Sequence, residues 1–361
     1  MEQSMFIEWV KKHFGPLVSA YVESINGSKN PLTYRFKSML TVDYSVTGKW
    51  EAVSAQNSLV AADIVAFDSP LPLKMRDSIS KQNGEIPKIG MELALNERQL
   101  TELEVLRAQK GTEVQLLRKL FADTPRVIGG VYETLEGAFL QALSTGTTLI
   151  QEVDNVGVGV RIDYGIPIGN KFGVAVLWSN PTTAKPLDDI QRLRKKVSAD
   201  GNAIGKVMLD NTAFDNMVAT TQIKEAFANS IGYLGQNLFA PDFDQLNTML
   251  QKKYKFVVEI VDRVIIREKN GVKSQYKPWA DGQISFLPGD NVGTLTWSPL
   301  AELSHPVAGV EYQVADEYIL ASKYRTNRPS LAEFTSSQAR VLPVLTNVDQ
   351  IYLLDTKTVQ A

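Results

Sequence analysis

The sequence TPRVIGGVYETLEGAFLQALS, residues 124–144, carries the clearest structural signal of the chain. Thr124 can cap a helix with its hydroxyl, Pro125 suits the first turn, and Gly146 can end the helix. The spacing of three or four between apolar residues is typical of a helix with one buried side, formed here by Val127, Val131, Leu135, Ala138 and Ala142. We therefore predict one helix about 30 Å long.

The residues before this helix predict an arm and a long excursion. A short helix with Phe6 and Phe14 on its apolar side is expected to end before Pro16, within an arm that covers the first 45 residues. Residues 50–95 predict a long two-stranded excursion, with strand-like runs at 58–78 and 88–96 and a flexible tip at 78–87 around Asn83 and Gly84. The alternative is a simple surface hairpin. Asn96 is expected to cap a helical region that extends to residue 121 and breaks near Gly111.

The residues after the helix predict strands and then an α/β subdomain. The apolar period changes to two in residues 147–153, 156–165 and 171–178. From about 186 to 304, predicted helices alternate with predicted strands, which favours a separate α/β subdomain. These elements are helices at 188–201, 211–229 (capped by Asn211 or Thr212) and 243–254, strands at 203–210, 255–268, 283–288 and 293–299, and a hairpin turn at Lys269-Asn270-Gly271.

The last 55 residues are rich in strand-forming residues again. Residues 317–326, 339–346 and 350–355 are the predicted strands. We expect them to return to the sheet that the 124–144 helix enters, so that the α/β subdomain is an insertion.

Composition limits the class of protein. The 361 residues are 44% hydrophobic, which is ample for a core, and no apolar run approaches the ~20 residues of a membrane helix. The chain has no cysteine, so disulfides and thiol chemistry are excluded, and this fits synthesis in a reducing cytoplasm. The net charge of −2 does not indicate a nucleic-acid-binding surface, although a local weak contact stays open.

The search for an enzyme site finds little. The two histidines, His13 and His305, have no spacing that suggests a metal site, and HExxH, GxSxG and GxxxxGK[ST] motifs are absent. Gly157 and Gly159 lack the third glycine of a dinucleotide loop and lie in a strand-like pattern. Helix capping and solvation explain the carboxylate pairs Asp188/Asp189 and Asp242/Asp244. We therefore predict no catalytic, cofactor-binding or metal-binding residues.

Basic residues offer two further possibilities. QRLRKK at 191–196 is the densest basic cluster, and it is either a solvated helix face or a contact for phosphates or an acidic neighbouring surface. Lys74, Lys81 and Lys88 could be reactive only if a partner group lay beside them.

Four segments together carry a resemblance to a known family. They are VRIDYG at 160–165, FDNMVATTQIKEAF at 214–227, NGVK at 270–273 followed by FLP at 286–288, and SQARVLPVLTNVDQIYLL at 337–354. In this order the chain resembles the capsid protein E family of tailed-phage major capsid proteins, the family of the phage lambda shell protein. The segment between Lys273 and Phe286 is longer than in the lambda pattern, and the first 95 residues match only in layout.

The resemblance implies an α+β fold, the tailed-phage and herpesvirus major capsid fold. It divides the chain into an N-terminal arm (1–45), an extended loop or E-loop (46–95), a peripheral domain with the spine helix (96–185 and 305–361) and an axial domain (186–304). The 124–144 helix is then the spine helix. We expect its glycines, Gly129 and Gly130, to allow a bend or changed tilt when the shell matures.

The implied role is that of a structural protein, not an enzyme. Hexamers and pentamers of the chain would form an icosahedral head around double-stranded DNA, assembled in the host cytoplasm. The implied partners are other copies of the chain, a scaffold protein, a portal, a cementing protein and DNA through weak contacts, with no membrane. Two alternatives stay open: an encapsulin-like nanocompartment shell, and an enzyme of unfamiliar type that works through carboxylates.

Overall fold

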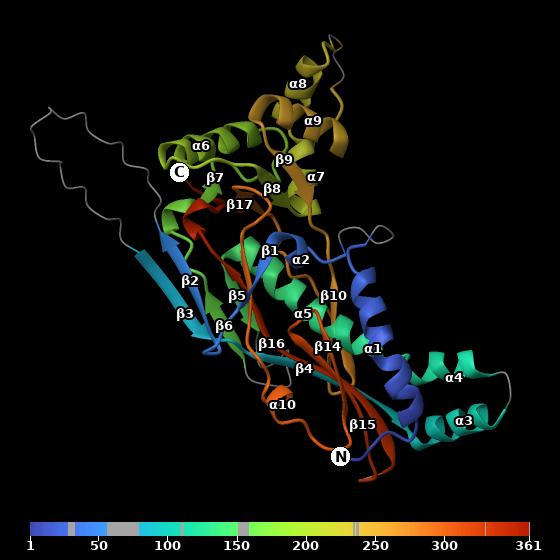
Figure 1. The fold of residues 1–361 in the computed structure, drawn as a ribbon. Coiled ribbons are helices and arrows are strands. Elements are labelled where there is room, and N and C mark those ends of the chain that lie inside the picture. Colours follow the sequence, from blue (N-terminus) through green and yellow to red (C-terminus); the bar gives the residue numbers. More distant parts are fainter. Residues whose placement is uncertain are drawn as a thin grey trace, which may run out of the picture. The chain divides into compact units, whose positions relative to one another are not determined.

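The computed structural model describes residues 1–27, 33–55, 79–109, 112–150, 159–233, 235, 238–328 and 330–360 (Figure 1). Contacts divide the chain into two compact units, which are described separately. The first unit contains Met1–Trp50, Gly84–Phe139 and Thr294–Val344. The second unit contains Glu51–Asn83, Leu140–Gly293 and Leu345–Ala361.

A six-stranded sheet forms the centre of the first unit. Its strand order is β1-β13-β16-β15-β14, and β4 also pairs with β16. The strands are β1 (Leu40–Tyr44), β4 (Lys88–Asn96), β13 (Gly293–Trp297), β14 (Glu311–Ala315), β15 (Ile319–Thr326) and β16 (Ala332–Leu345). The helices are α1 (Ile7–Ser24), α2 (Phe36–Met39), α3 (Glu97–Ala108), α4 (Glu113–Leu120), α10 (Ala301–Ser304) and most of α5 (Thr124–Thr145).

The predicted long helix is confirmed as α5. The part of α5 that belongs to the first unit lies in the core of that unit. Val127, Val131 and Leu135 are at most 1% exposed, as the spacing predicts. Gly146 follows the helix with φ +77° and donates its amide to Ala142. The predicted Thr124 cap is wrong. Val127 donates its amide to the carbonyl of Asp123, so Thr124 lies inside the helix, and its buried hydroxyl has no hydrogen-bond partner among the described residues.

Helix α1 does not end before Pro16 as predicted. It continues to Ser24, with Pro16 inside it. Val10, Phe14 and Val18 are all buried on one side of the helix, which packs on β14. Proline inside a helix costs about 3 kcal/mol. Burial of apolar residues on both sides of the proline therefore outweighs the lost backbone hydrogen bond.

Only one strand of the predicted excursion is confirmed: residues 88–96 form β4, which pairs with β16, whereas residues 58–78 lie outside the described part of the chain. β2 (Lys49–Ala55) pairs with β3 (Ile79–Glu85), and the intervening residues 56–78 lie outside the described part of the chain. The predicted tip residues Asn83 and Gly84 lie within β3. Gly84 is needed for a close approach rather than a turn, since a Cβ there would lie 2.8 Å from Nε1 of Trp50.

A mixed five-stranded sheet forms the second unit together with four helices. Its order is β7-β17-β12-β8-β9, in which β7 runs parallel to β17 and β8 parallel to β9. The strands are β7 (Lys171–Val174), β8 (Lys206–Leu209), β9 (Val257–Ile260), β12 (Gln283–Leu287) and β17 (Tyr352–Val359). The helices are α6 (Pro186–Ala199), α7 (Asn211–Ala219), α8 (Thr221–Ser230) and α9 (Phe243–Tyr254), with short 3-10 turns η1 (Ile168–Asn170) and η2 (Val348–Gln350).

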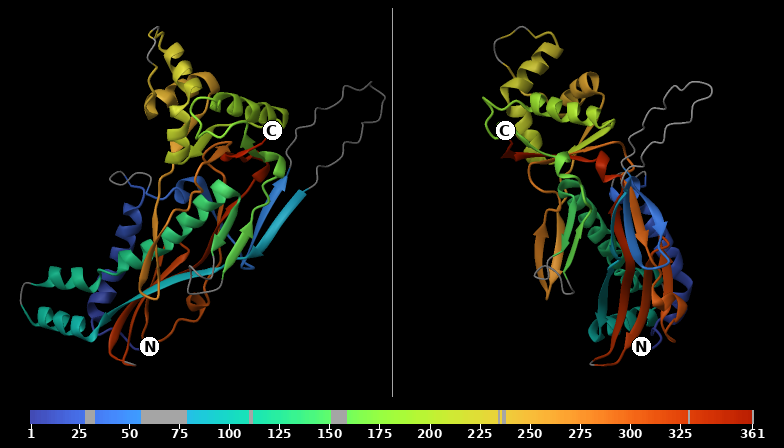
Figure 2. Two further views of the ribbon diagram at one scale, coloured as in Figure 1. Left: turned by 180° about the vertical axis from the view of Figure 1, so that it is seen from behind. Right: turned by 90° about the vertical axis from the view of Figure 1, so that its left-hand side faces the viewer.

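Alternate strand residues of this sheet form one core with the helices. Val207, Leu209, Ile284 and Phe286 pack with Leu193, Leu246 and Leu250 from α6 and α9, and all are at most 3% exposed. Two hairpins complete the unit: β5 (Thr147–Ile150) with β6 (Val160–Asp163), and β10 (Ile265–Lys269) with β11 (Val272–Tyr276). The β10–β11 hairpin extends away from the five-stranded sheet in both views of Figure 2.

Three predictions for this region need correction. The predicted 211–229 helix is two helices, because the side chain of Thr220 caps α8 and ends α7, and the cap of α7 is Asp210 rather than Asn211 or Thr212. The predicted 255–268 strand is split between β9 and β10, which belong to different sheets. The C-terminal strands do not share one sheet, since β15 and β16 lie in the first unit and β17 in the second.

Candidate functional site

The histidines occupy unrelated structural positions in the first unit. His13 stacks on Trp9 within α1, with ring centroids 6.0 Å apart, and its buried Nε2 has no hydrogen-bond partner in the described structure. His305 is exposed and ends α10. Among the residues described, no group of three or more His, Asp or Glu side chains could hold a metal ion. The same residues include no helix long and apolar enough to span a bilayer.

The predicted roles of the carboxylate pairs are partly correct. Asp242 caps α9 in a capping box with Gln245, and Asp244 is exposed in the first turn. Asp189 differs from the prediction, because its side chain is 4% exposed and accepts hydrogen bonds from the amide of Ala175 and the indole of Trp178. Its function is to hold the segment between β7 and α6. A buried aspartate at the start of a helix gives no sequence signal that distinguishes it from a cap.

The basic residues of the cluster at 191–196 fall into two groups, those with an ion-pair partner in α6 or just after it and those for which the described residues include none. Arg192 lies 3.6 Å from Asp189 and donates to the carbonyl of Gly173, and Lys196 pairs with Asp200. These two cations stabilise the unit internally. Arg194 and Lys195 have no ion-pair partner among the described residues, so they are the part of the cluster available for another molecule.

Of the remaining candidates, Lys88 and Gly159 lie within the described residues. Lys88 forms an ion pair with Glu302 at 3.1 Å. Lys74 and the side chain of Lys81 lie outside the described residues, as does Gly157, and Gly159 directly precedes β6.

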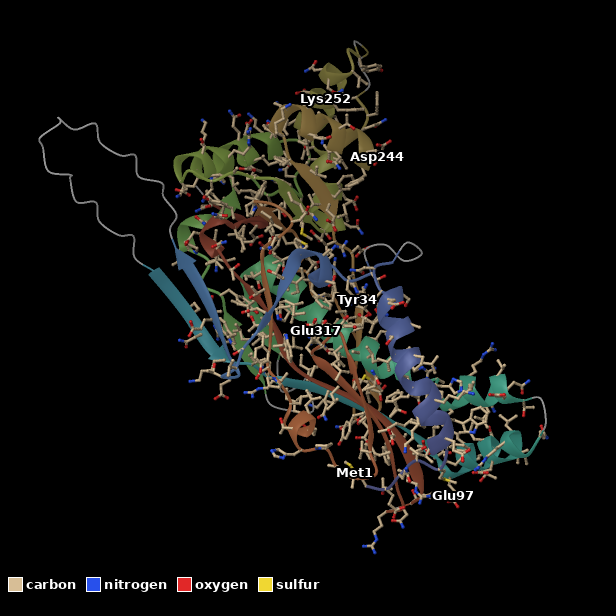
Figure 3. The ribbon with its side chains drawn as sticks, in the orientation of Figure 1. Met1, Tyr34, Glu97, Asp244, Lys252 and Glu317 are labelled. Carbon is tan, nitrogen blue, oxygen red and sulfur yellow. The ribbon has the colours of Figure 1, made fainter. Side chains whose placement is uncertain are left out.

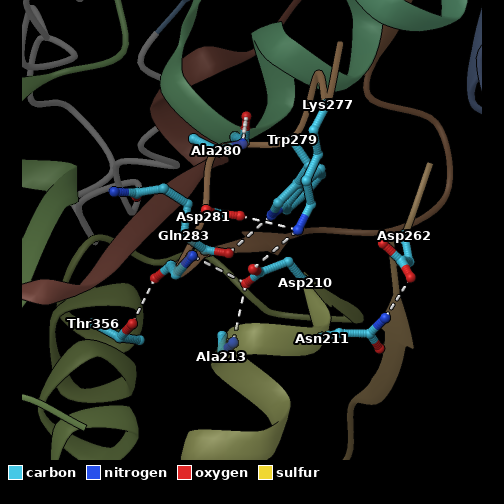
Figure 4. Close-up of polar contacts among 12 residues, drawn as sticks. Asp210, Asn211, Ala213, Asp262, Lys277, Trp279, Ala280, Asp281, Gln283 and Thr356 are labelled. Carbon is cyan, nitrogen blue, oxygen red and sulfur yellow. Dashed lines mark hydrogen bonds and ion pairs between the residues drawn. The ribbon is translucent and has the colours of Figure 1, made fainter. Parts of the chain in front are cut away.

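The β10–β11 hairpin is a projecting element with polar contacts on both sides. Its turn residues Asn270 and Gly271 have φ of 52° and 79°, as the Asn-Gly signal predicts. Both ends of the hairpin are tied to the start of α7 (Figure 4). Before β10, Asp262 accepts a hydrogen bond from Asn211, and after β11, Lys277 lies 3.8 Å from the carboxylate of Asp210.

Asp210 is the centre of this anchor. It is fully buried, and one of its oxygens accepts hydrogen bonds from the amides of Ala213 and Gly282, each at 3.1 Å. Lys277 also donates to Asp281 at 2.9 Å. This hydrogen bond raises the pKa of Lys277 and lowers the pKa of Asp281, so both groups stay charged at neutral pH. The anchor therefore fixes the direction of the hairpin by charge and by backbone contacts.

Exposed apolar side chains lie on the projecting parts of the second unit. On the hairpin, Ile266 and Val272 are 66% and 71% exposed. Between α8 and α9, the exposed apolar residues are Ile231, Tyr233, Leu238 and Phe239, and the ring of Phe239 packs edge-on against Phe227 and Tyr233. Clustered exposed apolar residues are typical of surfaces that contact another protein. The hairpin and the segment between α8 and α9 are therefore candidate contact surfaces.

Solved structures of a prophage protein and of a phage-related protein share this fold. A prophage protein of Escherichia coli CFT073, assigned as a capsid protein, is 10% identical and aligns over 94% of this chain and 98% of its own with a TM-score of 0.58. A phage-related protein of Bordetella bronchiseptica RB50 is 12% identical over 96% and 97%, with a TM-score of 0.50. The capsid of cyanophage A-1(L) is 10% identical over 90% and 92%, with a TM-score of 0.46.

The fold is therefore the α+β fold of tailed-phage capsid proteins, as the sequence predicts. The family described as phage major capsid protein E matches residues 23–355, and the chain belongs to this family. Its members are structural proteins of the phage shell, which are not enzymes. No curated protein matches the chain in sequence.

Proposed function

We propose that the chain is the subunit of an icosahedral phage head, in which hexamers and pentamers enclose double-stranded DNA. The observation that carries this proposal is the match of the phage major capsid protein E family over residues 23–355. Head assembly takes place in the host cytoplasm, and the product is the shell of the virion. The chain has no catalytic role in this process.

The contact surfaces of the second unit support self-assembly. A closed shell needs one chain to make several different contacts at slightly different angles. Projecting elements with exposed apolar residues, such as the β10–β11 hairpin and the segment between α8 and α9, provide such contacts. Two-stranded hairpins are marginally stable alone in water, so packing against a neighbouring copy would also stabilise them.

We further propose the domain roles implied by the family. Residues 1–45 act as the N-terminal arm, 46–95 as the E-loop, 96–185 with 305–361 as the peripheral domain, and 186–304 as the axial domain. Helix α5 is then the spine helix. Scaffold, portal and cementing proteins are the external partners, and the net charge of −2 is compatible with a lining that contacts packaged DNA only weakly.

Size and morphology of the purified protein test the proposal. We expect gel filtration and electron microscopy to show closed particles of megadalton mass, with the scaffold protein supplied where it is needed. A protein that stays a small oligomer under all conditions would contradict shell formation. Deletion of residues 73–87 should leave soluble subunits that form no shells, and normal shells from that deletion would refute the E-loop assignment.

The content of the particles distinguishes a phage head from an encapsulin-like compartment. We expect particles from infected cells to contain double-stranded DNA that resists nuclease until the shell is opened. Particles that contain an enzyme and no genome would favour the encapsulin-like alternative.

A further inference from the structure

Helix α9 carries opposite charges at its two ends. Asp242 and Asp244 lie at its start, and Lys252, Lys253 and Lys255 at its end. The helix has 12 residues, so these groups are separated by up to about 18 Å. Figure 3 labels Asp244 and Lys252, which project from different ends of α9.

The cations at the end of α9 belong to a larger patch that includes α6. The ring of Tyr254 contacts two cations, with the Arg194 guanidinium 4.9 Å and the Lys253 ammonium 5.3 Å from its centroid. This contact places the end of α9 beside the C-terminal half of α6. The cationic end, as we name it, consists of Arg194, Lys195, Lys252, Lys253 and Lys255, and none of them has an ion-pair partner in the described part of the chain.

The anions at the start of α9 form a matching patch with α7. Phe214 and Phe243 pack with ring centroids 5.9 Å apart, and the neighbouring residues Asp215 and Asp244 are both exposed. The anionic end consists of Asp215, Asp242 and Asp244, which likewise have no ion-pair partner among the described residues. It adjoins the segment between α8 and α9 that carries exposed Tyr233 and Phe239.

Two complementary patches on one unit fit a ring of identical copies. Rings are built by head-to-tail contacts, in which one surface of each copy binds a different surface of the next. We propose that the cationic end of one copy binds the anionic end of the next copy around a capsomer. This inference rests on the proposed function, and it assigns the chemistry of one contact within the hexamers and pentamers. Apolar Tyr233 and Phe239 would be covered at the same contact.

Contact with DNA phosphates is the competing explanation for the cationic end. It engages the five cations only, whereas a contact between copies also engages the exposed carboxylates Asp215 and Asp244, which stay accessible beside the capping residue Asp242. A second copy accounts for both patches. The charges would also guide encounter between copies and reject wrong orientations, since like charges placed together cost several kcal/mol.

Charge reversal tests this contact. The first variant carries Lys195→Glu, Lys252→Glu and Lys253→Glu, so that three glutamates outnumber the remaining cations Arg194 and Lys255. The second variant carries Asp215→Lys and Asp244→Lys, so that two lysines outnumber the remaining Asp242. Asp242 is left unchanged because it caps α9. At low ionic strength we expect each variant alone to lose assembled particles by about tenfold or more. The variant with all five changes has the sign of both patches reversed, so its assembly should recover toward the wild-type level.

A mixture of the two reversal variants gives a sharper result. The first variant has two anionic ends and the second has two cationic ends, so the two can alternate around a ring. Alternation closes in a hexamer but not in a pentamer. We therefore expect the mixture to form six-membered rings or hexamer-only tubes, and no closed shells with pentamers. Electron microscopy and native mass spectrometry of the mixed particles measure this outcome.

The controls separate this inference from the proposed function. Wild-type protein that forms no particles overturns both. Wild-type shells together with normal shells from either reversal variant overturn only the contact proposed here. If the lysine variant forms normal shells that fail to retain DNA, the cationic end binds phosphates instead. Circular dichroism of each soluble variant checks that a loss of assembly does not arise from unfolding.

Discussion

The ammonium of Lys323 and the carboxylate of Glu333 lie 4.0 Å apart, and neither side chain has any exposed surface. Lys323 donates hydrogen bonds to the carbonyl of Leu120 and the hydroxyl of Thr335, each at 3.0 Å. Glu333 accepts hydrogen bonds from the hydroxyl of Ser4 and the amide of Met5. Burial lowers the pKa of Lys323 below its ordinary value, and the nearby Glu333 carboxylate offsets only part of this effect. The pair therefore connects β15 and β16 to the N-terminal segment.

Removal of one partner of this pair should destabilise the subunit strongly. Lys323→Met leaves the Glu333 carboxylate buried without a counter-charge, and we expect the free energy of unfolding to fall by about 3–5 kcal/mol. The double variant Lys323→Met with Glu333→Gln removes both charges and should lose clearly less. Urea unfolding of the dissociated subunit measures both values. Equal losses in the single and double variants would show that the charge pair is not the cause.

The paired glycines of α5 are explained by close packing. A Cβ on Gly129 would lie 2.8 Å from the hydroxyl of Tyr21, and one on Gly130 would overlap the sulfur of Met91. Glycine inside a helix is otherwise unfavourable by roughly 1 kcal/mol relative to alanine. The close approach of α1 and β4 to α5 therefore accounts for both residues without any movement of the helix.

Gly130→Ala should reveal this packing in a double-variant cycle. We expect Gly130→Ala alone to destabilise the subunit by about 1–3 kcal/mol through overpacking. In a Met91→Ala background the same change should be neutral or stabilising, since the sulfur is gone and the helix propensity improves. Equal effects in the two backgrounds would contradict the packing explanation.

The predicted bend of α5 at these glycines needs a separate measurement. Electron microscopy of immature and mature particles compares the direction of α5 before and after Gly129–Gly130. A helix that is straight in both particles would refute the bend.

Local signals predicted several elements correctly. Residues 124–144 and 243–254 have unbroken apolar periods and became α5 and α9. Asn96 forms the expected cap, reinforced by a capping box with Gln99. These signals depend on residues within one turn of each other, so the sequence contains all of the relevant interactions.

Features that depend on distant packing were not predicted. Helix α1 continues through Pro16 because its apolar residues are buried against β14, and Gly84 serves a contact with Trp50 rather than a turn. The contact surfaces likewise depend on packing that the sequence alone does not reveal. The cluster at 191–196 was visible in sequence, but its division between internal pairs and free cations depends on Asp189, Asp200 and Tyr254. The lysines at the end of α9, which join this cluster in the folded unit, do not stand out as a basic cluster in the sequence.

The turn between β14 and β15 offers a way to stabilise the subunit. Asp316 and Glu317 both have positive φ, of 49° and 64°, in a turn that favours an Asp-Gly pair. Asp316 accepts hydrogen bonds from Lys37 and Tyr132, whereas Glu317, labelled in Figure 3, is exposed. We expect Glu317→Gly to raise the free energy of unfolding by roughly 0.5–1 kcal/mol, because the left-handed conformation is strained for glutamate.

The matched control for this change is Asp316→Gly. It relieves the same kind of strain but removes the acceptor for Lys37 and Tyr132, so it should destabilise the subunit. Thermal unfolding of the two variants gives the comparison. A lower melting temperature for Glu317→Gly would show that the backbone strain is not significant.

Stability of the second unit should decline at alkaline pH, and Tyr352 is one identifiable cause. Burial raises the pKa of Tyr352 from 10.0 to about 12, and its hydroxyl donates to Asp200 and accepts from Asn202, each at 2.8 Å. Between pH 10 and 12 the unfolded chain loses the phenol proton while the folded chain keeps it. The stabilisation from this group is therefore complete below pH 10 and is lost as the pH rises toward 12.

Tyr352→Phe should make unfolding less dependent on pH within this window. The variant is expected to be less stable at pH 8, because Asp200 and Asn202 lose a hydrogen-bond partner. Its further decline between pH 10 and 12 should be smaller than that of the wild-type protein, although other tyrosines with raised pKa values, such as Tyr324, still contribute. Urea midpoints at several pH values measure the two slopes. Parallel slopes would show that the phenol of Tyr352 titrates alike in the folded and unfolded chains.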